Sequence, residues 1–139
     1  MADSSRISLE EALIYSMVTL SAADRSMTDR ELRKIGDLVQ SLPIFSGFNP
    51  ENLVKVAEDC GGLLQSDDGL DAVLDVIADT LPDRLYDTAY ALAVEVAAAD
   101  LHVEQEELRF LQLLRDRLNL DKLTIAAIET SARARYRSA

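Results

Sequence analysis

Two short acidic segments of the chain have the residue types and the spacing of a cation-binding site. Asp24 is followed seven residues later by Glu31, and Asp100 is followed seven residues later by Glu107. Each aspartate comes directly after an Ala-Ala pair that we expect to end a helix, where exposed carbonyl groups make a negative charge unfavourable by roughly 0.3–1 kcal/mol. A divalent cation would offset that cost, because hard cations bind carboxylate and carbonyl oxygens together.

The two segments belong to a longer internal repeat. With a shift of 76 residues, six of the twelve positions in 22–33 are identical to those in 98–109, including the aspartate, the glutamate and the leucine that follows it. The apolar pattern continues in the same register over 9–42 and 85–118. We interpret these stretches as a duplicated helix–turn–helix related by a pseudo-twofold.

Helix geometry then restricts which acids could share an ion. Glu11 and Asp24 lie thirteen residues apart on one expected helix, hence about 20 Å apart. If the helices expected at 8–24 and 83–100 pack antiparallel, the start of each meets the end of the other. The two acidic clusters expected from this packing are Glu11 with Asp100 and Glu107, and Asp87 with Asp24 and Glu31.

The same acids also have an explanation that needs no ligand. Asp24 and Asp100 could lock their turns through hydrogen bonds to the next helix, and Glu31 and Glu107 could serve as partners of a helix cap or of the helix dipole. The turn after Asp24 lacks the alternating oxygen ligands and central glycine of an EF-hand. The single histidine, His102, is interpreted as a solvated turn residue, with metal ligation as the alternative.

Around these segments the sequence predicts helices throughout. Apolar residues recur at helical spacing and no stretch alternates with period two. Ser8 with Glu11 and Thr28 with Glu31 fit the capping box, and Asn49-Pro50 fits a helix start. Pro43–Phe48 is expected to be a loop that packs its two phenylalanines on the core, and Gly61-Gly62 to end a helix. The expected helices are 8–24, 28–42, 49–61, 67–80, 83–100, 104–118 and 121–136.

The expected organisation is therefore one all-α domain over 1–139. Its repeat halves are about 8–64 and 83–136, joined by a linker helix at about 67–80. No apolar run reaches the roughly 20 residues of a transmembrane helix. The start of the chain has no signal-peptide pattern, and the lone cysteine, Cys60, excludes an internal disulfide and is interpreted as a packing residue. These features together favour a cytoplasmic protein.

Charge narrows the expected partners. The formal net charge is −11, and three of the 14 basic residues lie in the C-terminal tail, at Arg133, Arg135 and Arg137. An acidic body repels phosphate backbones, so we expect no nucleic acid as a partner. The basic tail suits a helix carboxy terminus, or alternatively a segment that docks on an acidic protein partner such as a second copy in a homodimer.

The repeated motif resembles a known family. A long apolar helix ending in Ala-Ala-Asp, a short turn with one apolar residue (Met27, Val103), and Glu-Leu opening the next helix are similar to the TerB-like tellurite resistance family, including its J-domain-associated modules. The resemblance implies an all-helical fold with internal pseudo-symmetry, a role in stress response, and a divalent cation (Ca²⁺, Mg²⁺, Mn²⁺ or Zn²⁺) at the acidic positions. The family commonly has glycine after the aspartate, where this chain has Arg25 and Leu101.

No catalytic constellation is present in the sequence. It has no glycine-rich phosphate loop and no nucleophile elbow, so an enzyme is the least favoured class. The preferred function is a stress-response module that binds a divalent cation at the duplicated acidic turns. The alternatives are a metal-free protein-interaction scaffold and, third, a carrier of a small molecule or lipid in a groove between the halves.

Overall fold

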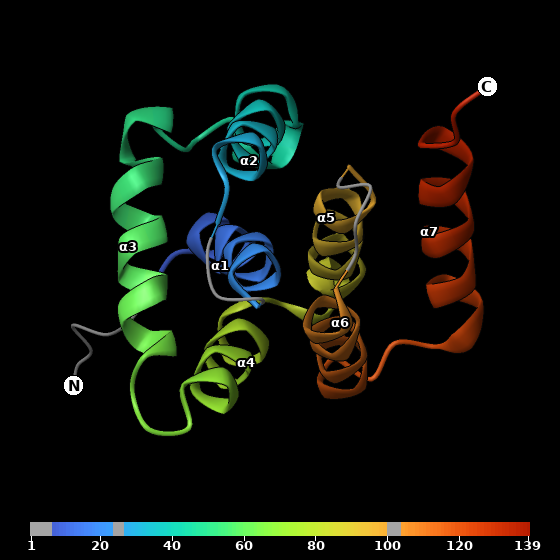
Figure 1. Ribbon diagram of the computed structural model, residues 1–139. Coiled ribbons are helices and arrows are strands. Elements are labelled where there is room, and N and C mark those ends of the chain that lie inside the picture. Colours follow the sequence, from blue (N-terminus) through green and yellow to red (C-terminus); the bar gives the residue numbers. More distant parts are fainter. Residues whose placement is uncertain (1–6, 24–26, 100–103) are drawn as a thin grey trace.

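The structure is a computed structural model that describes residues 7–23, 27–99 and 104–139. Within these ranges it contains seven α-helices, three short 3-10 turns and no strand, so the all-α prediction is confirmed for the described chain (Figure 1). No described helix has the length and apolar character needed to span a membrane. The helices are α1 (Leu9–Ala22), α2 (Asp29–Ser41), α3 (Leu53–Leu64), α4 (Gly69–Thr80), α5 (Tyr86–Ala99), α6 (Gln105–Arg117) and α7 (Lys122–Arg135).

Local capping explains where α1 and α2 begin. The Ser8 hydroxyl accepts a hydrogen bond from the Glu11 N–H at 3.1 Å, and the Glu11 carboxylate accepts one from the Ser8 N–H at 2.8 Å. Thr28 and Glu31 make the same reciprocal pair at the start of α2, at 3.1 and 2.9 Å. Both capping boxes predicted from the sequence are confirmed.

The expected end of the third helix at Gly61-Gly62 is wrong. After a 3-10 turn at Pro50–Asn52, α3 runs through both glycines to Leu64. Neither glycine adopts a positive φ, and the leucines that follow them pack against the core. Burial of these leucines outweighs the low helix propensity of glycine, and the chain turns later, at Asp68, whose φ is 55°.

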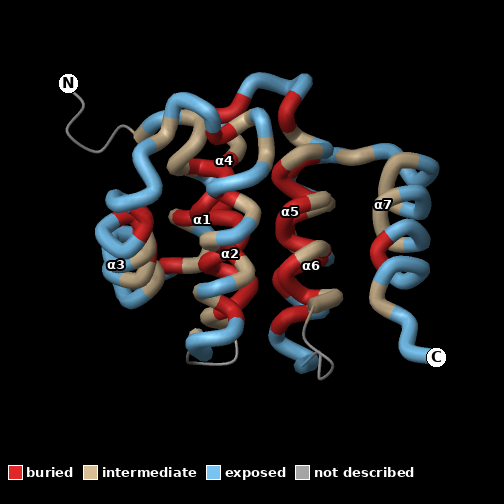
Figure 2. Tube along the Cα trace, turned by 90° about the horizontal axis from the view of Figure 1, so that it is seen from above, coloured by how far each residue is buried: buried red, intermediate tan, exposed pale blue. Residues whose placement is uncertain are grey.

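The core is built around α1. Every residue from Ala12 to Ser21 is buried, because α1 contacts α2, α3, α4, α5 and α6. Figure 2 shows α1 beside α5, and the contact between these two helices is the most extensive among the described helices. The loop expected at Pro43–Phe48 forms a 3-10 turn that buries Phe45 and packs Phe48 on the core, as predicted.

The assumption that α1 and α5 pack antiparallel is wrong. Helix α2 runs antiparallel to α1. The segment that follows the end of α2 lies beside the start of α1, because the Glu10 carboxylate is 3.5 Å from the position that a Cβ on Gly47 would occupy. The same α2 also runs opposite to α5: the Lys34 Nζ lies 3.5 Å from Glu95, while Leu42, near the other end, shares a groove with Ala91. Helices α1 and α5 therefore run in the same direction.

This direction gathers four helix ends at one end of the bundle. Residues Thr19 and Ala22 near the end of α1 line a cavity together with Glu106 and Phe110 near the start of α6. We call the carboxy ends of α1 and α5 with the starts of α2 and α6 the hairpin end. The expected pseudo-twofold relation between the halves stays a prediction.

Helix α7 lies at one side of the molecule, opposite α3 (Figure 1). It packs mainly on α5, and Ala132 is its one buried residue. Glu95 of α5 ties its last turn in place, because its carboxylate pairs with Arg135 and accepts a hydrogen bond from Tyr136. Burial acts to raise the pKa of Glu95, but these bonds outweigh it and hold the pKa below its usual range.

Candidate functional site

Glu31 is a buried carboxylate at the start of α2. Its side chain is 6% exposed. The Oε1 atom accepts hydrogen bonds from the Thr28 N–H at 2.9 Å and from the Thr28 hydroxyl at 3.1 Å. The cap therefore fixes the position of this carboxylate at the hairpin end.

Glu107 occupies the equivalent position at the start of α6 and is 1% exposed. Its Oε1 accepts a hydrogen bond from the Glu104 N–H at 3.0 Å, which is the bond that Glu31 accepts from Thr28. A cap was one of the roles expected of Glu107, but Glu104 was not predicted as its partner because glutamate is not a usual residue at the position before a helix. The repeat carried the signal, since Glu104 aligns with Thr28.

Glu11 and Asp87 lie at the opposite end of the bundle, so their expected pairing with the other acids is wrong. Glu11 caps the start of α1. Asp87 lies in the first turn of α5 and lines a cavity with Leu118 and Asp121, which follow α6. The physical reason is the common direction of α1 and α5, which places the start of each helix about 20 Å from the hairpin end.

Two residues of the expected site, Asp24 and Asp100, lie outside the described residues, and so does His102, which was interpreted as a solvated turn residue. In the sequence, Asp24 comes two residues after the end of α1 and Asp100 comes directly after α5. Among the residues that the structure describes, no group of three or more histidine, cysteine or acidic side chains could hold a metal ion.

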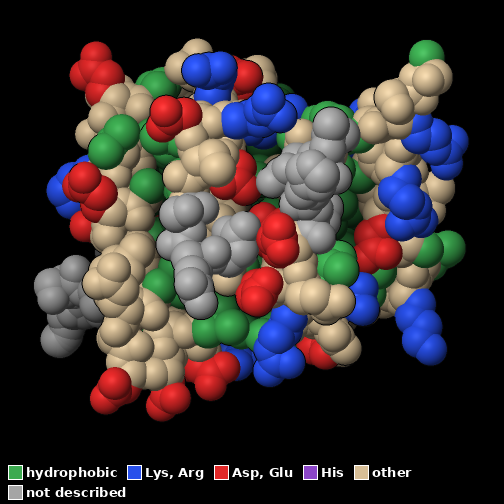
Figure 3. Space-filling view, in the orientation of Figure 1, with side chains coloured by type: hydrophobic (Ala, Val, Ile, Leu, Met, Phe, Trp, Pro, Cys, Tyr) green, Lys and Arg blue, Asp and Glu red, His purple; other side chains and the backbone are tan. Residues whose placement is uncertain are grey.

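The described donors at the hairpin end fit an oxygen-preferring cation. Glu31 and Glu107 each accept a cap hydrogen bond with Oε1, and carboxylates are the ligands that hard cations prefer. Buried carboxylates are generally stabilised by hydrogen bonds, by a positive partner or by a metal. Figure 3 looks onto this end, and acidic side chains lie near the middle of the face.

Cys60 does not have the properties of a nucleophile. It is fully buried in α3, and its thiol lies 3.4 Å from the Thr19 hydroxyl of α1. Burial raises the pKa of the Cys60 thiol to about 11, although the Thr19 hydrogen bond lowers it slightly. A thiol with this pKa is protonated at neutral pH, so the interpretation of Cys60 as a packing residue is confirmed.

Comparison of the sequence with models of known protein families finds a match. The model of the family described as tellurite resistance protein TerB matches residues 10–130. No curated protein and no solved structure matches the chain. The matched range runs from the first turn of α1 into α7 and includes both acidic segments.

Proposed function

The chain belongs to the TerB tellurite resistance family, and from this membership and the geometry of the hairpin end we propose that it is a non-enzymatic, cytoplasmic stress-response module that binds a divalent cation. The proposed ligands are Asp24 and Glu31 after α1, and Asp100 and Glu107 after α5. Glu11 and Asp87 are not ligands of this site, because they lie at the other end of the bundle.

The observation that carries the proposal is the placement of Glu31 and Glu107. Both carboxylates are buried, both are held by the same cap hydrogen bond, and both lie at the hairpin end. Each begins the helix that follows a turn opened by an aspartate in the sequence. An aspartate after a helix end adds negative charge where carbonyl oxygens already face outward, and a cation stabilises that combination.

The donor chemistry favours some cations over others. The proposed ligands supply only carboxylate oxygens, with backbone carbonyls at the helix ends. Ca²⁺, Mg²⁺ and Mn²⁺ prefer oxygen, whereas Zn²⁺ is usually bound by cysteine and histidine. Cys60 is buried against α1 and is not a candidate ligand. The ligand type therefore favours Ca²⁺, Mg²⁺ or Mn²⁺ as the ion that this site is built to hold.

A specific observation also favours the second candidate, a metal-free interaction scaffold. The cap hydrogen bonds of Glu31 and Glu107 are by themselves a sufficient reason for a glutamate at each position, and no bound ion is needed to explain them. On this alternative the acidic segments serve to fix the hairpin turns. The two candidates differ in whether the folded protein takes up a cation.

Calorimetric titration of the full chain with Ca²⁺, Mg²⁺, Mn²⁺ and Zn²⁺ tests the proposal. The informative variant is Glu31→Gln, because glutamine can still form a capping box but carries no charge. The matched control is Glu11→Gln, which makes the same change in the capping box at the opposite end. We expect Glu31→Gln to weaken binding by about tenfold or more and Glu11→Gln to leave it unchanged.

Two results would contradict the cation proposal. One is the absence of binding heat with all four cations in the wild-type protein, together with an unchanged melting temperature. The other is an equal loss of affinity in Glu31→Gln and Glu11→Gln, which would mean that the cation is attracted by the net negative charge of the protein and not by a specific site. Either result leaves the scaffold as the better account.

A further inference from the structure

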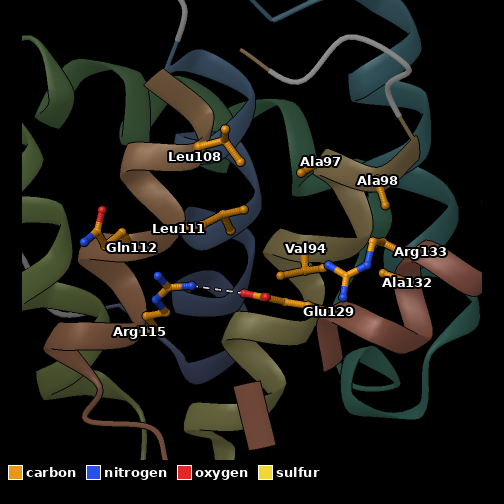
Figure 4. A pocket seen from close by; sticks show the side chains of 10 residues that line it. All are labelled: Val94, Ala97, Ala98, Leu108, Leu111, Gln112, Arg115, Glu129, Ala132 and Arg133. Atoms are coloured by element: carbon orange, nitrogen blue, oxygen red, sulfur yellow. Dashed lines mark hydrogen bonds and ion pairs between the residues drawn. The ribbon is translucent and has the colours of Figure 1, made fainter. Parts of the chain in front are cut away.

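A groove beside α7 is not explained by the proposed cation site. On the side of α6, a cavity of about 460 Å³ opens between α5, α6 and α7. Figure 4 shows its walls, which come from all three helices. Its apolar lining residues are Val94, Ala97, Ala98, Leu108, Leu111 and Ala132.

The charges of the side chains that line this groove do not sum to zero. Arg115 pairs with Glu129 at 3.1 Å, and Glu129 also accepts a hydrogen bond from Tyr90. Arg133 makes no ion pair with any described residue, and its guanidinium donates a hydrogen bond to the Thr130 hydroxyl at 3.3 Å. The groove therefore has one uncompensated positive charge, and Figure 4 shows the Arg133 guanidinium beside Val94 and Ala132.

The apolar wall of the groove is incompletely covered. Leu108, one of three large hydrophobic residues that are strongly exposed, is 52% exposed and faces this cavity. A chain-like ligand in the groove would cover it. Cavities of a few hundred Å³ with apolar walls and few polar groups are typical of small-molecule sites.

A second groove, on the opposite side of α7, differs in charge. Its volume is about 480 Å³, and it is lined by apolar residues of α2, α5 and α7. Its charged residues, Glu95 and Arg135, pair with each other. The two grooves are similar in size and apolar character, so the unpaired Arg133 distinguishes the first.

We propose that the groove between α5, α6 and α7 binds a monocarboxylate with an unbranched apolar chain, of the fatty acid class. The chain lies on the apolar walls and covers Leu108, and the carboxylate pairs with Arg133. The charge-assisted bond to the guanidinium and the apolar contact together select this class over neutral lipids and over cationic amphiphiles. The site involves none of the proposed cation ligands, so the two proposals stand or fall separately.

Titration of the full chain with octanoate, decanoate and dodecanoate, in buffer free of divalent cations, tests the apolar part of the site. Each added methylene that becomes buried is expected to tighten binding about fourfold. Dodecanoate should therefore bind about 15-fold more tightly than decanoate. Dodecyltrimethylammonium has the same chain with the opposite charge, and it should bind at least tenfold more weakly than dodecanoate.

Two matched pairs of variants test the assignment of residues. Arg133→Gln should weaken dodecanoate binding about tenfold, whereas Arg137→Gln, on the same tail but outside the groove, should not. Leu108→Gln should weaken it several-fold, whereas Leu123→Gln, which removes another exposed leucine outside the groove, should not. All four positions are exposed, so none of these changes should prevent folding.

Three results would overturn the proposal. These are no binding of dodecanoate below its aggregation concentration, an affinity that does not depend on chain length, and equal losses within both matched pairs. Circular dichroism melting of each variant confirms that a loss of binding does not come from a loss of fold.

Discussion

Cys60 and its neighbours show how burial fixes the protonation of single residues. The thiol lies between α1 and α3, within 3.4 Å of the Thr19 hydroxyl, and burial raises its pKa to about 11. Burial likewise raises the pKa of Tyr15 and of Tyr90 to about 12. All three groups are therefore neutral in the folded protein over the whole neutral and mildly alkaline range.

A loss of stability at alkaline pH follows from Cys60. In the unfolded chain the thiol ionises near its ordinary pKa of 9.0, while in the folded protein it stays protonated up to about pH 11. The unfolded state therefore binds fewer protons between these values, and the free energy of unfolding falls by up to about 1.4 kcal/mol per pH unit.

Urea unfolding of wild type and Cys60→Ala at pH 8, 9, 10 and 11 measures this effect. The wild type should lose more stability than the variant over this range, although the variant starts lower because of its cavity. Tyr90 contributes equally to both proteins, and burial, the main cause of the raised pKa of Tyr15, also remains in the variant; the variant loses only the repulsion between Tyr15 and the Cys60 thiolate. Parallel stability curves would contradict the assignment to the thiol.

The residues of the candidate site were predictable only in part. The cap of Glu31 could be predicted because Thr28 and Glu31 are close in sequence and their bond is local. The burial of Glu31 and Glu107 could not, because it depends on which helices cover the hairpin end. The repeat identified Glu107 as the equivalent residue before its partner, the Glu104 N–H, was known.

At the scale of the helices, Gly62 of α3 and Gly69 of α4 differ in the space around them. A Cβ added to Gly62 would meet no atom within 4 Å. A Cβ added to Gly69 would lie 2.1 Å from the backbone oxygen of Leu64, so glycine is required where the end of α3 meets the start of α4.

Alanine substitutions should therefore change stability in opposite directions. Gly62→Ala should raise the free energy of unfolding by about 0.5–1 kcal/mol, because alanine favours the helix and fits the open space. Gly69→Ala should lower it, because the backbone of α3 must move away. Urea unfolding of both variants beside wild type tests this, and a destabilising Gly62→Ala would contradict the continuous α3.

The ends of the helices were easier to predict than their interruptions. Ser8, Thr28 and Asn49 begin their segments as expected, because a cap is a contact within one turn of chain. Gly61-Gly62 was misinterpreted as a helix end, because its outcome depends on the burial of the leucines beyond it. Local signals therefore predicted the seven helices, while tertiary packing extended α3.

At the scale of the whole molecule, the relative direction of α1 and α5 decides which acids can meet. The sequence repeat predicts two equivalent hairpins but is compatible with either direction. The structure shows the parallel arrangement, in which Glu31 and Glu107 share one end of the bundle and Glu11 and Asp87 lie at the other. The proposed cation site therefore lies at one end of the bundle, in place of the two separate clusters expected from the sequence.

Placing the ion in the folded protein tests this central claim most directly. Mn²⁺ is paramagnetic and broadens the NMR signals of nearby amides. On adding a substoichiometric amount to the ¹⁵N-labelled chain, we expect the amides of Asp29–Leu32 and Gln105–Leu108 to lose intensity. The amides around Glu11 and Asp87 should keep theirs, since α1 and α5 each span about 20 Å. Broadening centred on Glu11 or Asp87, or spread evenly over the acidic surface, would contradict a cation site at the hairpin end.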